Sequence, residues 1–258
     1  MDLGISGKKA IVCASSKGLG LGCAIALADA GVDLTICART EYQLTVAKNI
    51  IEEKGVKVDI VVCDITTKEG IEKVLKSMPS PDILINNAGG PPPGNWEDWT
   101  NDDFLRAIQA NMLTPITLIQ RVLPSMISKK WGRIVNITSG AVKAPIPALG
   151  LSNSARAGLT GFVAGVSRQV ARDGVCINNI LPGVHDTDRI KGFDETLAKS
   201  LKISIEEARR RKALTIPAGY YGDAEGFGNT CAFLCSQHAA FIIGQNILVD
   251  GGAINATI

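Results

Sequence analysis

The chain has 258 residues, 46% of them hydrophobic, which is enough to bury one large core in a single domain. Its formal net charge of +2 is close to balance and no basic block stands out, so we expect neither nucleic acid nor an anionic membrane as a partner. The sequence contains no run of about 18 apolar residues, and residues 1–9 lack the apolar core of a signal peptide. We therefore expect a cytoplasmic protein.

The cysteines and histidines offer little for metal chemistry. The chain has seven cysteines but no C-x-x-C pair, and its only histidines are His185 and His238. Most of the cysteines fall in apolar segments, where they are expected to act as small buried side chains. Because a zinc site needs several such ligands at short spacings, we expect no bound metal.

A short apolar run at Ala10–Cys13 predicts the first buried strand. Small polar residues follow it, and from Leu19 apolar residues recur at helical spacing until Gly31. This pattern predicts a strand, a turn and a helix in direct succession.

The turn between this strand and helix is rich in glycine. Glycines let the backbone pass close to a pyrophosphate, and the N-terminus of the following helix offers unpaired N–H groups to the phosphate charge. The usual fingerprint has a glycine where Ala14 stands, which leaves Gly18 and Gly20 as the surviving pair. The turn therefore predicts a dinucleotide site, with a tight turn that binds nothing as the alternative.

Strands and helices alternate along the rest of the chain. The predicted strands after the first are Val32–Ala38, Val56–Cys63, Ile83–Asn86, Arg133–Thr138, Cys176–Leu181 and one ending at Val249. The predicted helices are Glu41–Lys54, Lys68–Ser77, one within Asp102–Ser128, one within Ser152–Asp173 and one before the last strand. Alternation with crossover helices predicts an α/β fold, a Rossmann-type doubly wound sheet of seven parallel strands with helices on both faces.

In such a sheet, ligands bind beyond the carboxyl ends of the strands. Polar residues and glycines indeed follow the predicted strand ends. They are Arg39-Thr40 after the second strand, Asp64 after the third, Asn86-Asn87-Ala88-Gly89 after the fourth, Ser139 after the fifth, and Pro182-Gly183 with Thr187 after the sixth. We expect the chemistry of the protein to collect at this edge.

With these motifs in this order, the chain resembles a classical short-chain dehydrogenase/reductase over essentially its whole length. Asn111 within the long helix and the closing Gly244–Gly252 segment belong to the same pattern. The resemblance implies a nicotinamide cofactor and reversible hydride transfer between an alcohol and a carbonyl. It implies cofactor contacts at Ala14, Ser15, Ser16, Lys17, Gly18, Leu19, Gly20, Arg39, Thr40, Asp64, Ile65, Asn87, Ala88, Gly89, Arg156, Pro182, Gly183, Val184 and Thr187.

The choice of cofactor is argued from charge. An adenosine ribose with free hydroxyls is normally held by an acid after the second strand, whereas a 2′-phosphate needs cations there. Arg39 occupies that segment and Lys17 lies in the glycine turn, so we predict NADP(H) rather than NAD(H). The alternative is that both are ordinary surface cations. Asp64, by resemblance, accepts a hydrogen bond from the adenine amino group, or else caps the helix that follows it.

The chain departs from the family at the acid–base residues. The family has a Tyr thirteen residues after the serine, here Ser139, and a Lys four residues after that Tyr. Those positions hold Ser152 and Arg156. Arg156 can anchor ribose hydroxyls but cannot relay a proton as Lys does, and the Ser152 hydroxyl is a much weaker acid than a phenol. We therefore expect catalytic roles for Asn111, Ser139, Ser152 and Arg156 with a different proton donor.

Two side chains outside this pair are candidates for that donor. His185 follows Pro182-Gly183-Val184, and the alternative is an exposed loop histidine. Tyr221, or its neighbour Tyr220, lies in a loop before the last helix. A water molecule or a group of the substrate is the remaining possibility.

The segment 188–214 is charged and helix-prone. Resemblance places a substrate lid there, although a solvated helix face explains the charges equally well. Small residues recur along the helix that begins near Ser152, and family members pair this helix across a two-fold axis, so we predict a homotetramer. The leading function is an NADP(H)-dependent oxidoreductase acting on a small-molecule carbonyl or alcohol. The alternatives are a cofactor-binding sensor or scaffold without catalysis, and non-redox chemistry on the same scaffold.

Overall fold

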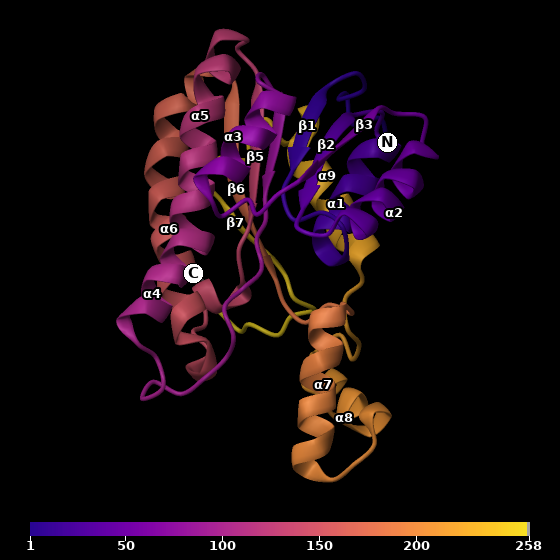
Figure 1. The fold of residues 1–258 in the computed structure, drawn as a ribbon, viewed down its shortest axis with the longest axis vertical. Helices are drawn as coiled ribbons and strands as arrows, with labels where there is room; N and C mark the ends of the chain where they lie inside the picture. The colour runs from indigo at the N-terminus through magenta and orange to yellow at the C-terminus, as the bar shows by residue number, and fades with distance from the viewer. Residues whose placement is uncertain (257–258) are drawn as a thin grey trace.

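A computed structural model describes residues 1–256 of the chain. Its centre is one parallel sheet of seven strands in the order β3-β2-β1-β4-β5-β6-β7 (Figure 1). The strands are β1 (Lys9–Val12), β2 (Asp33–Ala38), β3 (Val58–Val62), β4 (Ile83–Asn86), β5 (Gly132–Ile137), β6 (Val175–Pro182) and β7 (Asn246–Val249). The strand order reverses direction between β1 and β4, so the predicted doubly wound sheet is confirmed.

Helices cover both faces of the sheet. The first face carries α1 (Gly18–Asp29), α2 (Glu41–Glu52) and α9 (Ala224–Cys235). The second face carries α3 (Lys68–Ser77), α5 (Thr114–Ser128) and α6 (Gly150–Val170). The apolar central strands β1, β2, β4, β5 and β6 are largely buried between these two layers, because both of their faces are covered, whereas the edge strands β3 and β7 are partly exposed.

The helices α1 and α9 cross at two glycines. A Cβ atom on Gly22 would lie 2.1 Å from the Ala224 carbonyl oxygen, and one on Gly228 would lie 2.2 Å from the Gly22 carbonyl oxygen. No side chain fits between the two backbones at this point. The close crossing fixes α1, and with it the glycine turn that precedes α1, against the rest of the domain.

The long helix predicted within residues 102–128 is interrupted. It consists of α4 (Asn101–Ile108), a π-helical turn at Gln109–Leu113 and α5. The helix begins with a reciprocal capping box in which the Thr100 hydroxyl accepts from the Asp103 N–H and the Asp103 carboxylate accepts from the Thr100 N–H. Periodicity of apolar residues does not reveal the π turn, since it adds one residue to a single turn of an otherwise regular helix.

Two helices, α7 (Asp188–Leu201) and α8 (Ile205–Ala213), project from the body of the domain as a hairpin (Figure 1). This hairpin follows β6 directly, at the edge of the sheet where strands β1, β4 and β5 also end. Short 3₁₀ turns fill several of the other connections. Within residues 1–256 no helix is both long and apolar enough to cross a membrane.

Candidate active site

The glycine turn after β1 has an unusual backbone at its first residue. Ala14 has a φ of 46°, in the left-handed region that favours glycine. A Cβ on Gly20 would lie 2.4 Å from the Ala14 carbonyl oxygen, so the turn requires glycine there. The Asn87 amide nitrogen donates to the same carbonyl oxygen over 3.1 Å, which ties the turn to the loop after β4.

The residues of this turn fit the phosphates of a dinucleotide. The helix α1 begins at Gly18, and no side chain caps its N-terminus. Its first N–H groups and the positive end of its dipole are therefore available to an anion. Ser15 is fully buried and donates from Oγ to the Val12 carbonyl oxygen. Thr187, in the loop between β6 and α7, lies against Gly18.

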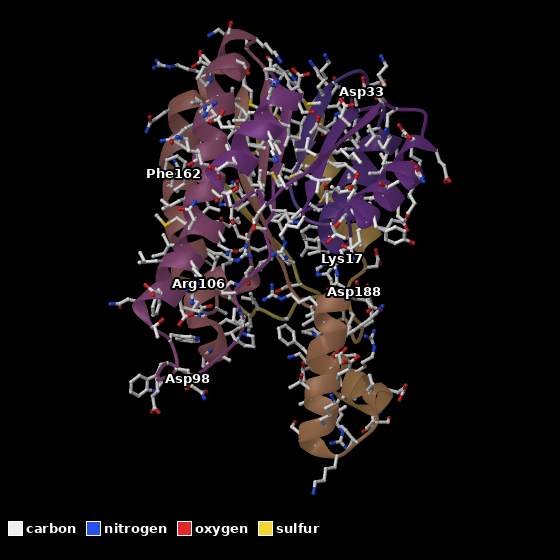
Figure 2. All side chains as sticks on the ribbon, viewed as in Figure 1. Lys17, Asp33, Asp98, Arg106, Phe162 and Asp188 are labelled. Atoms are coloured by element: carbon white, nitrogen blue, oxygen red, sulfur yellow. The ribbon has the colours of Figure 1, made fainter. Side chains whose placement is uncertain are left out.

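The cations expected to select the cofactor lie on the surface. Arg39 is exposed directly after β2, and its charge contributes to lowering the pKa of Asp64. The Lys17 ammonium lies 3.3 Å from the Asp188 carboxylate at the start of α7, with both side chains more than half exposed (Figure 2). This ion pair joins the glycine turn to the helical hairpin.

Asp64 does not cap the following helix. The cap of α3 is Thr67, whose hydroxyl accepts from the Gly70 N–H. One carboxylate oxygen of Asp64 accepts from both the N–H and the hydroxyl of Thr66, at 2.9 and 2.7 Å. The Thr66 N–H lowers the pKa of Asp64 most, so this carboxylate is charged at neutral pH. Of the two roles expected for Asp64, helix capping is therefore wrong.

The residues that replace the family's Tyr and Lys contact each other. Ser152 and Arg156 are both buried, one turn apart on α6, and Arg156 Nε donates to Ser152 Oγ over 3.2 Å. Arg156 Nη1 donates to the Ile137 carbonyl oxygen at the end of β5, over 2.8 Å. Burial, and secondly the charge of Arg189, lowers the pKa of Arg156 to about 10, which still leaves it protonated at neutral pH.

Ser139 follows β5 and begins a short 3₁₀ turn that packs against α6. Its hydroxyl oxygen accepts from the Ala141 N–H over 3.1 Å. Because that oxygen already accepts one hydrogen bond, its own proton is free to point outward to a ligand. Ser139 and Ser152 thus share one arrangement, in which the hydroxyl oxygen accepts a hydrogen bond from the protein and the hydroxyl proton has no acceptor among the described residues.

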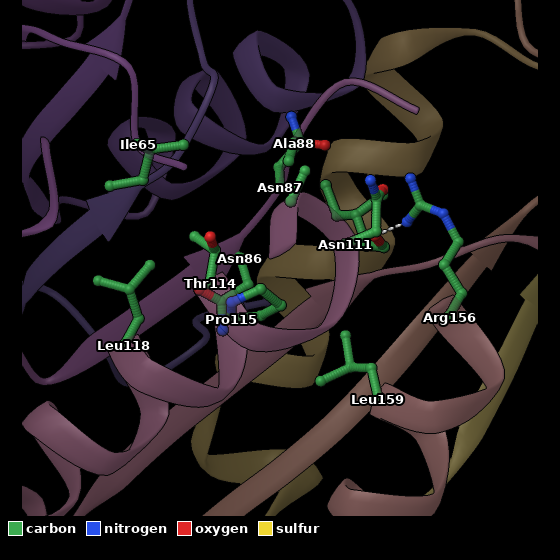
Figure 3. Close-up of a pocket in the computed structure, with 12 residues that line it drawn as sticks. Ile65, Asn86, Asn87, Ala88, Asn111, Thr114, Pro115, Leu118, Arg156 and Leu159 are labelled. Carbon is green, nitrogen blue, oxygen red and sulfur yellow. Dashed lines mark hydrogen bonds between the residues drawn. The ribbon is translucent and has the colours of Figure 1, made fainter. Parts of the chain in front are cut away.

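Asn111 lies in the π-helical turn between α4 and α5 and is 4% exposed. Its amide nitrogen donates to the Gly89 carbonyl oxygen over 3.4 Å. Figure 3 shows Arg156 reaching from α6 toward Asn111, with Asn87 and Ala88 on the neighbouring loop. These residues line a cavity of about 20 Å³, which has room for one water molecule.

A ladder of asparagines runs under this site and was not predicted from the sequence. Asn86 on β4 donates to Asn136 on β5 over 2.8 Å, Asn136 donates to Asn179 on β6 over 3.0 Å, and Asn179 donates to Asn246 on β7 over 2.8 Å. Each pair is in direct register across the parallel sheet. This network fixes the four strands, and with them the loops that carry the candidate site residues, relative to one another.

The two candidate proton donors make contacts elsewhere. His185 is 4% exposed, so it is not the exposed loop histidine of the alternative interpretation. Its ring packs edge-on against Phe227, Nδ1 lies 3.3 Å from the Gly183 carbonyl oxygen, and burial lowers its pKa. The Tyr221 hydroxyl donates to Asp194 in the helical hairpin over 2.8 Å, and burial together with this carboxylate raises its pKa.

The remaining predicted cofactor contacts lie at the same edge of the sheet. Thr40 precedes α2, Ile65 is buried after β3, and Pro182 ends β6. The Gly183 N–H donates to the Val249 carbonyl oxygen, and the Val184 carbonyl oxygen accepts from Gly222. Ser16 and Leu19 flank Lys17 and Gly18 in the glycine turn.

One cation at this edge was missed by the sequence analysis. Arg189, in the first turn of α7, reaches back across the cleft to the loop after β4, where Nη2 donates to the Pro91 carbonyl oxygen over 3.1 Å. A Cβ on Gly90 would lie 2.5 Å from Arg189 Nη1. Within residues 1–256 no group of three or more His, Cys, Asp or Glu side chains is arranged to hold a metal ion.

This fold and edge of the sheet are those of a known enzyme family. A family model described as enoyl-(acyl carrier protein) reductase matches residues 13–254. The 3-oxoacyl-acyl-carrier-protein reductase FabG of Vibrio cholerae is 30% identical over 256 residues, which cover 97% of this chain and 98% of that protein. The chain therefore belongs to the short-chain dehydrogenase/reductase family, and the expected class of enzyme, an NAD(P)-dependent oxidoreductase of this family, is confirmed.

The chain is also similar to two reductases whose names include NADPH. The NADPH-dependent reductase BacG of Bacillus subtilis is 30% identical over 258 residues, which cover 98% of this chain and 100% of the relative. The structure of L-sorbose reductase from Gluconobacter frateurii, complexed with NADPH and L-sorbose, has a TM-score of 0.94 at 28% identity. That alignment covers 99% of this chain and 100% of the reductase.

Proposed function

We propose that the protein is an NADP(H)-dependent oxidoreductase for a carbonyl or alcohol, in which the pair Ser152–Arg156 stands in place of a Tyr–Lys pair. The observation that carries the proposal is the hydrogen bond from Arg156 Nε to Ser152 Oγ, which makes the two residues one unit on α6. The choice of NADP(H) is supported by similar proteins whose names describe them as NADPH-dependent or as complexed with NADPH.

The residues that would hold the cofactor follow four strands and lie on α6. The glycine turn and the N-terminus of α1 would receive the pyrophosphate and Arg39 would meet the 2′-phosphate, while Asn87 positions the turn through the Ala14 carbonyl oxygen. Thr187, after β6, would add a contact beside Gly18, and Arg156 would bind the nicotinamide ribose. When bound, the nicotinamide supplies or accepts the hydride.

The chain's own residues handle the oxygen of the substrate. The hydroxyl protons of Ser139 and Ser152 both remain available to that oxygen, because each hydroxyl oxygen accepts its inner hydrogen bond from the protein. The Arg156 guanidinium stabilises negative charge on Ser152 Oγ when its proton moves toward the substrate. Water then restores the proton, since Arg156 stays charged.

This arrangement predicts slower chemistry than a phenol would give. A serine hydroxyl is a weak acid, and general acid catalysis by a matched group is worth about 10²- to 10⁴-fold in rate. Positioning and polarisation of the carbonyl remain. The second candidate function is a cofactor-binding protein with no catalysis, which is favoured by the engagement of His185 and Tyr221 away from Ser152.

Turnover separates the two functions. Oxidation of NADPH is followed by absorbance with a panel of activated ketones, for wild type and for Ser139→Ala and Ser152→Ala. We expect slow turnover in wild type and a fall of about tenfold or more in each variant, with unchanged NADPH affinity. If wild type binds NADPH but reduces no ketone, the non-catalytic function takes first place.

We also propose a homotetramer and a cytoplasmic location. On α6, Ala157, Gly161 and Gly165 are exposed, and a Cβ on either glycine would meet no atom of the chain within 4 Å. A helix of a second copy can approach this flat strip closely. All seven cysteines are free, as in proteins of a reducing compartment. The hairpin of α7 and α8 is proposed as the lid over the substrate.

A further inference from the structure

Two arginines, Arg156 on α6 and Arg189 on α7, lie near the loop that follows β4. Arg156 is buried on α6 and lines the cavity with Asn111 and Ala88 (Figure 3). Arg189 starts from α7, is partly open to solvent and lies against the loop at Gly90 and Pro91. Both therefore border residues 88–91, Arg156 beside Ala88 in the cavity and Arg189 at Pro91. One of the two cations is buried and the other is exposed.

The carboxylates around this cleft are already paired with other cations. Asp186 and Asp194 both pair with Arg209, at 3.0 and 3.1 Å. Asp188, the neighbour of Arg189, pairs with Lys17 and Lys191. Among the residues that the structure describes, neither Arg156 nor Arg189 forms an ion pair with a carboxylate.

The positive charges of Arg156 and Arg189 also repel each other. The charge of Arg189 is one of the two causes that lower the pKa of Arg156, the larger being burial. A buried cation without a counter-charge is costly, and two unmatched cations beside the same loop attract an anion. Arg189 is held ready for one by its hydrogen bond to Pro91 and by stacking on the Phe193 ring at 5.7 Å.

We propose that Arg156 and Arg189 together bind the carboxylate of the substrate, which is a short 2-oxo or 3-oxo acid or the matching hydroxy acid. This inference rests on the proposed function. The substrate must be short because Arg156 donates to Ser152 through Nε. The other donors of Arg156 therefore lie close to the carbonyl that reacts at Ser152, so the carboxylate is only one or two carbons away from that carbonyl. Arg156 has Nη2 left for one carboxylate oxygen, because its Nε and Nη1 already donate to Ser152 and Ile137, and Arg189 has Nε and Nη1 left for the other.

The binding test uses an unreactive pair of probes. Cyclohexanecarboxylate and its neutral isostere, cyclohexanecarboxamide, are titrated by calorimetry into protein saturated with NADPH. We expect the acid to bind about tenfold tighter or more than the amide, as charge-assisted hydrogen bonds predict. Arg189→Met should remove that difference. The matched control is Lys191→Met, which removes a cation from the same helix and should keep it.

The kinetic test compares acetoacetate with methyl acetoacetate, and 2-oxopentanoate with its methyl ester. The ratio of kcat/KM for acid over ester should fall about tenfold or more in Arg189→Met and stay within about twofold in Lys191→Met. Comparing variants cancels the difference in intrinsic reactivity between acid and ester.

The outcomes separate this inference from the function it rests on. Turnover of ketones or esters with no preference for acids in either test overturns the carboxylate site and leaves the oxidoreductase standing. Tight binding of cyclohexanecarboxylate that depends on Arg189, with no turnover of any probe, supports the anion site and contradicts the catalytic proposal. If Arg189→Met weakens NADPH itself and no acid binds, the arginine serves the cofactor and the inference is wrong.

Discussion

Replacing Arg39 with Asp tests the basis of cofactor choice. Arg39 is exposed, and its charge helps to lower the pKa of Asp64. Among the described residues its guanidinium forms no ion pair, so it is available to bind a 2′-phosphate. A charge-assisted hydrogen bond contributes about 1.5–3 kcal/mol, which is roughly 10- to 150-fold in affinity. Because the site is exposed and screened, we expect the lower end, about tenfold in favour of NADPH. Arg39→Asp should erase or reverse this preference.

Lys17 should matter less. Its ion pair with Asp188 joins two exposed side chains, and such pairs contribute about 0–1 kcal/mol. In the complex with NADPH, Lys17 would be shared between this carboxylate and the 2′-phosphate. Lys17→Met should weaken NADPH by roughly threefold and NADH hardly at all. Fluorescence titration of both cofactors at fixed ionic strength gives all the affinities, with Lys48→Met as a remote control. Equal affinities of wild type for NADPH and NADH would refute the reasoning.

Three further predictions concern the replaced pair, the turn and the assembly. Ser152→Tyr combined with Arg156→Lys should raise the rate on activated ketones by more than the product of the single effects, because a phenol needs the ammonium to lower its pKa. A double-mutant rate no greater than that product would contradict this. Ala14→Gly should stabilise the fold by about 1 kcal/mol in urea unfolding, since Ala14 has a φ of 46°, and an unchanged midpoint would count against strain there. Gly161→Trp, placed where a Cβ meets no atom of its own chain, should split a tetramer without unfolding the protein, and light scattering that shows a single-chain mass for wild type would rule the tetramer out.

The alternation of strands and helices could be predicted because each apolar strand ends in a polar or glycine signal. The fourth strand and the helix that follows the third were predicted with the bounds that the structure has, Ile83–Asn86 and Lys68–Ser77. The asparagine ladder could not be predicted. Each of its residues lies within or at the end of an apolar strand, and only the register of four strands brings Asn86 and Asn246 onto one line.

Parts of the site also depend on contacts far apart in sequence. Arg189 belongs to a charged segment that looks like a solvated helix face, and its role becomes visible only where the chain folds back onto Pro91. His185 was expected either at the substrate or exposed, because a short polar loop does not show that Phe227 covers its ring. By contrast, the pairing of Ser152 and Arg156 was predictable, since residues four apart on a helix share one face.

Transfer of a labelled hydride tests the central claim most directly. NADPH that carries deuterium at C4 of the nicotinamide, on the transferred side, is incubated with wild type and acetoacetate, and the product is analysed by mass spectrometry. The account predicts a hydroxy acid that carries the deuterium, formed more slowly by Ser152→Ala. Tight binding of NADPH without any deuterium in a product, from this acid or from a panel of ketones, would contradict it.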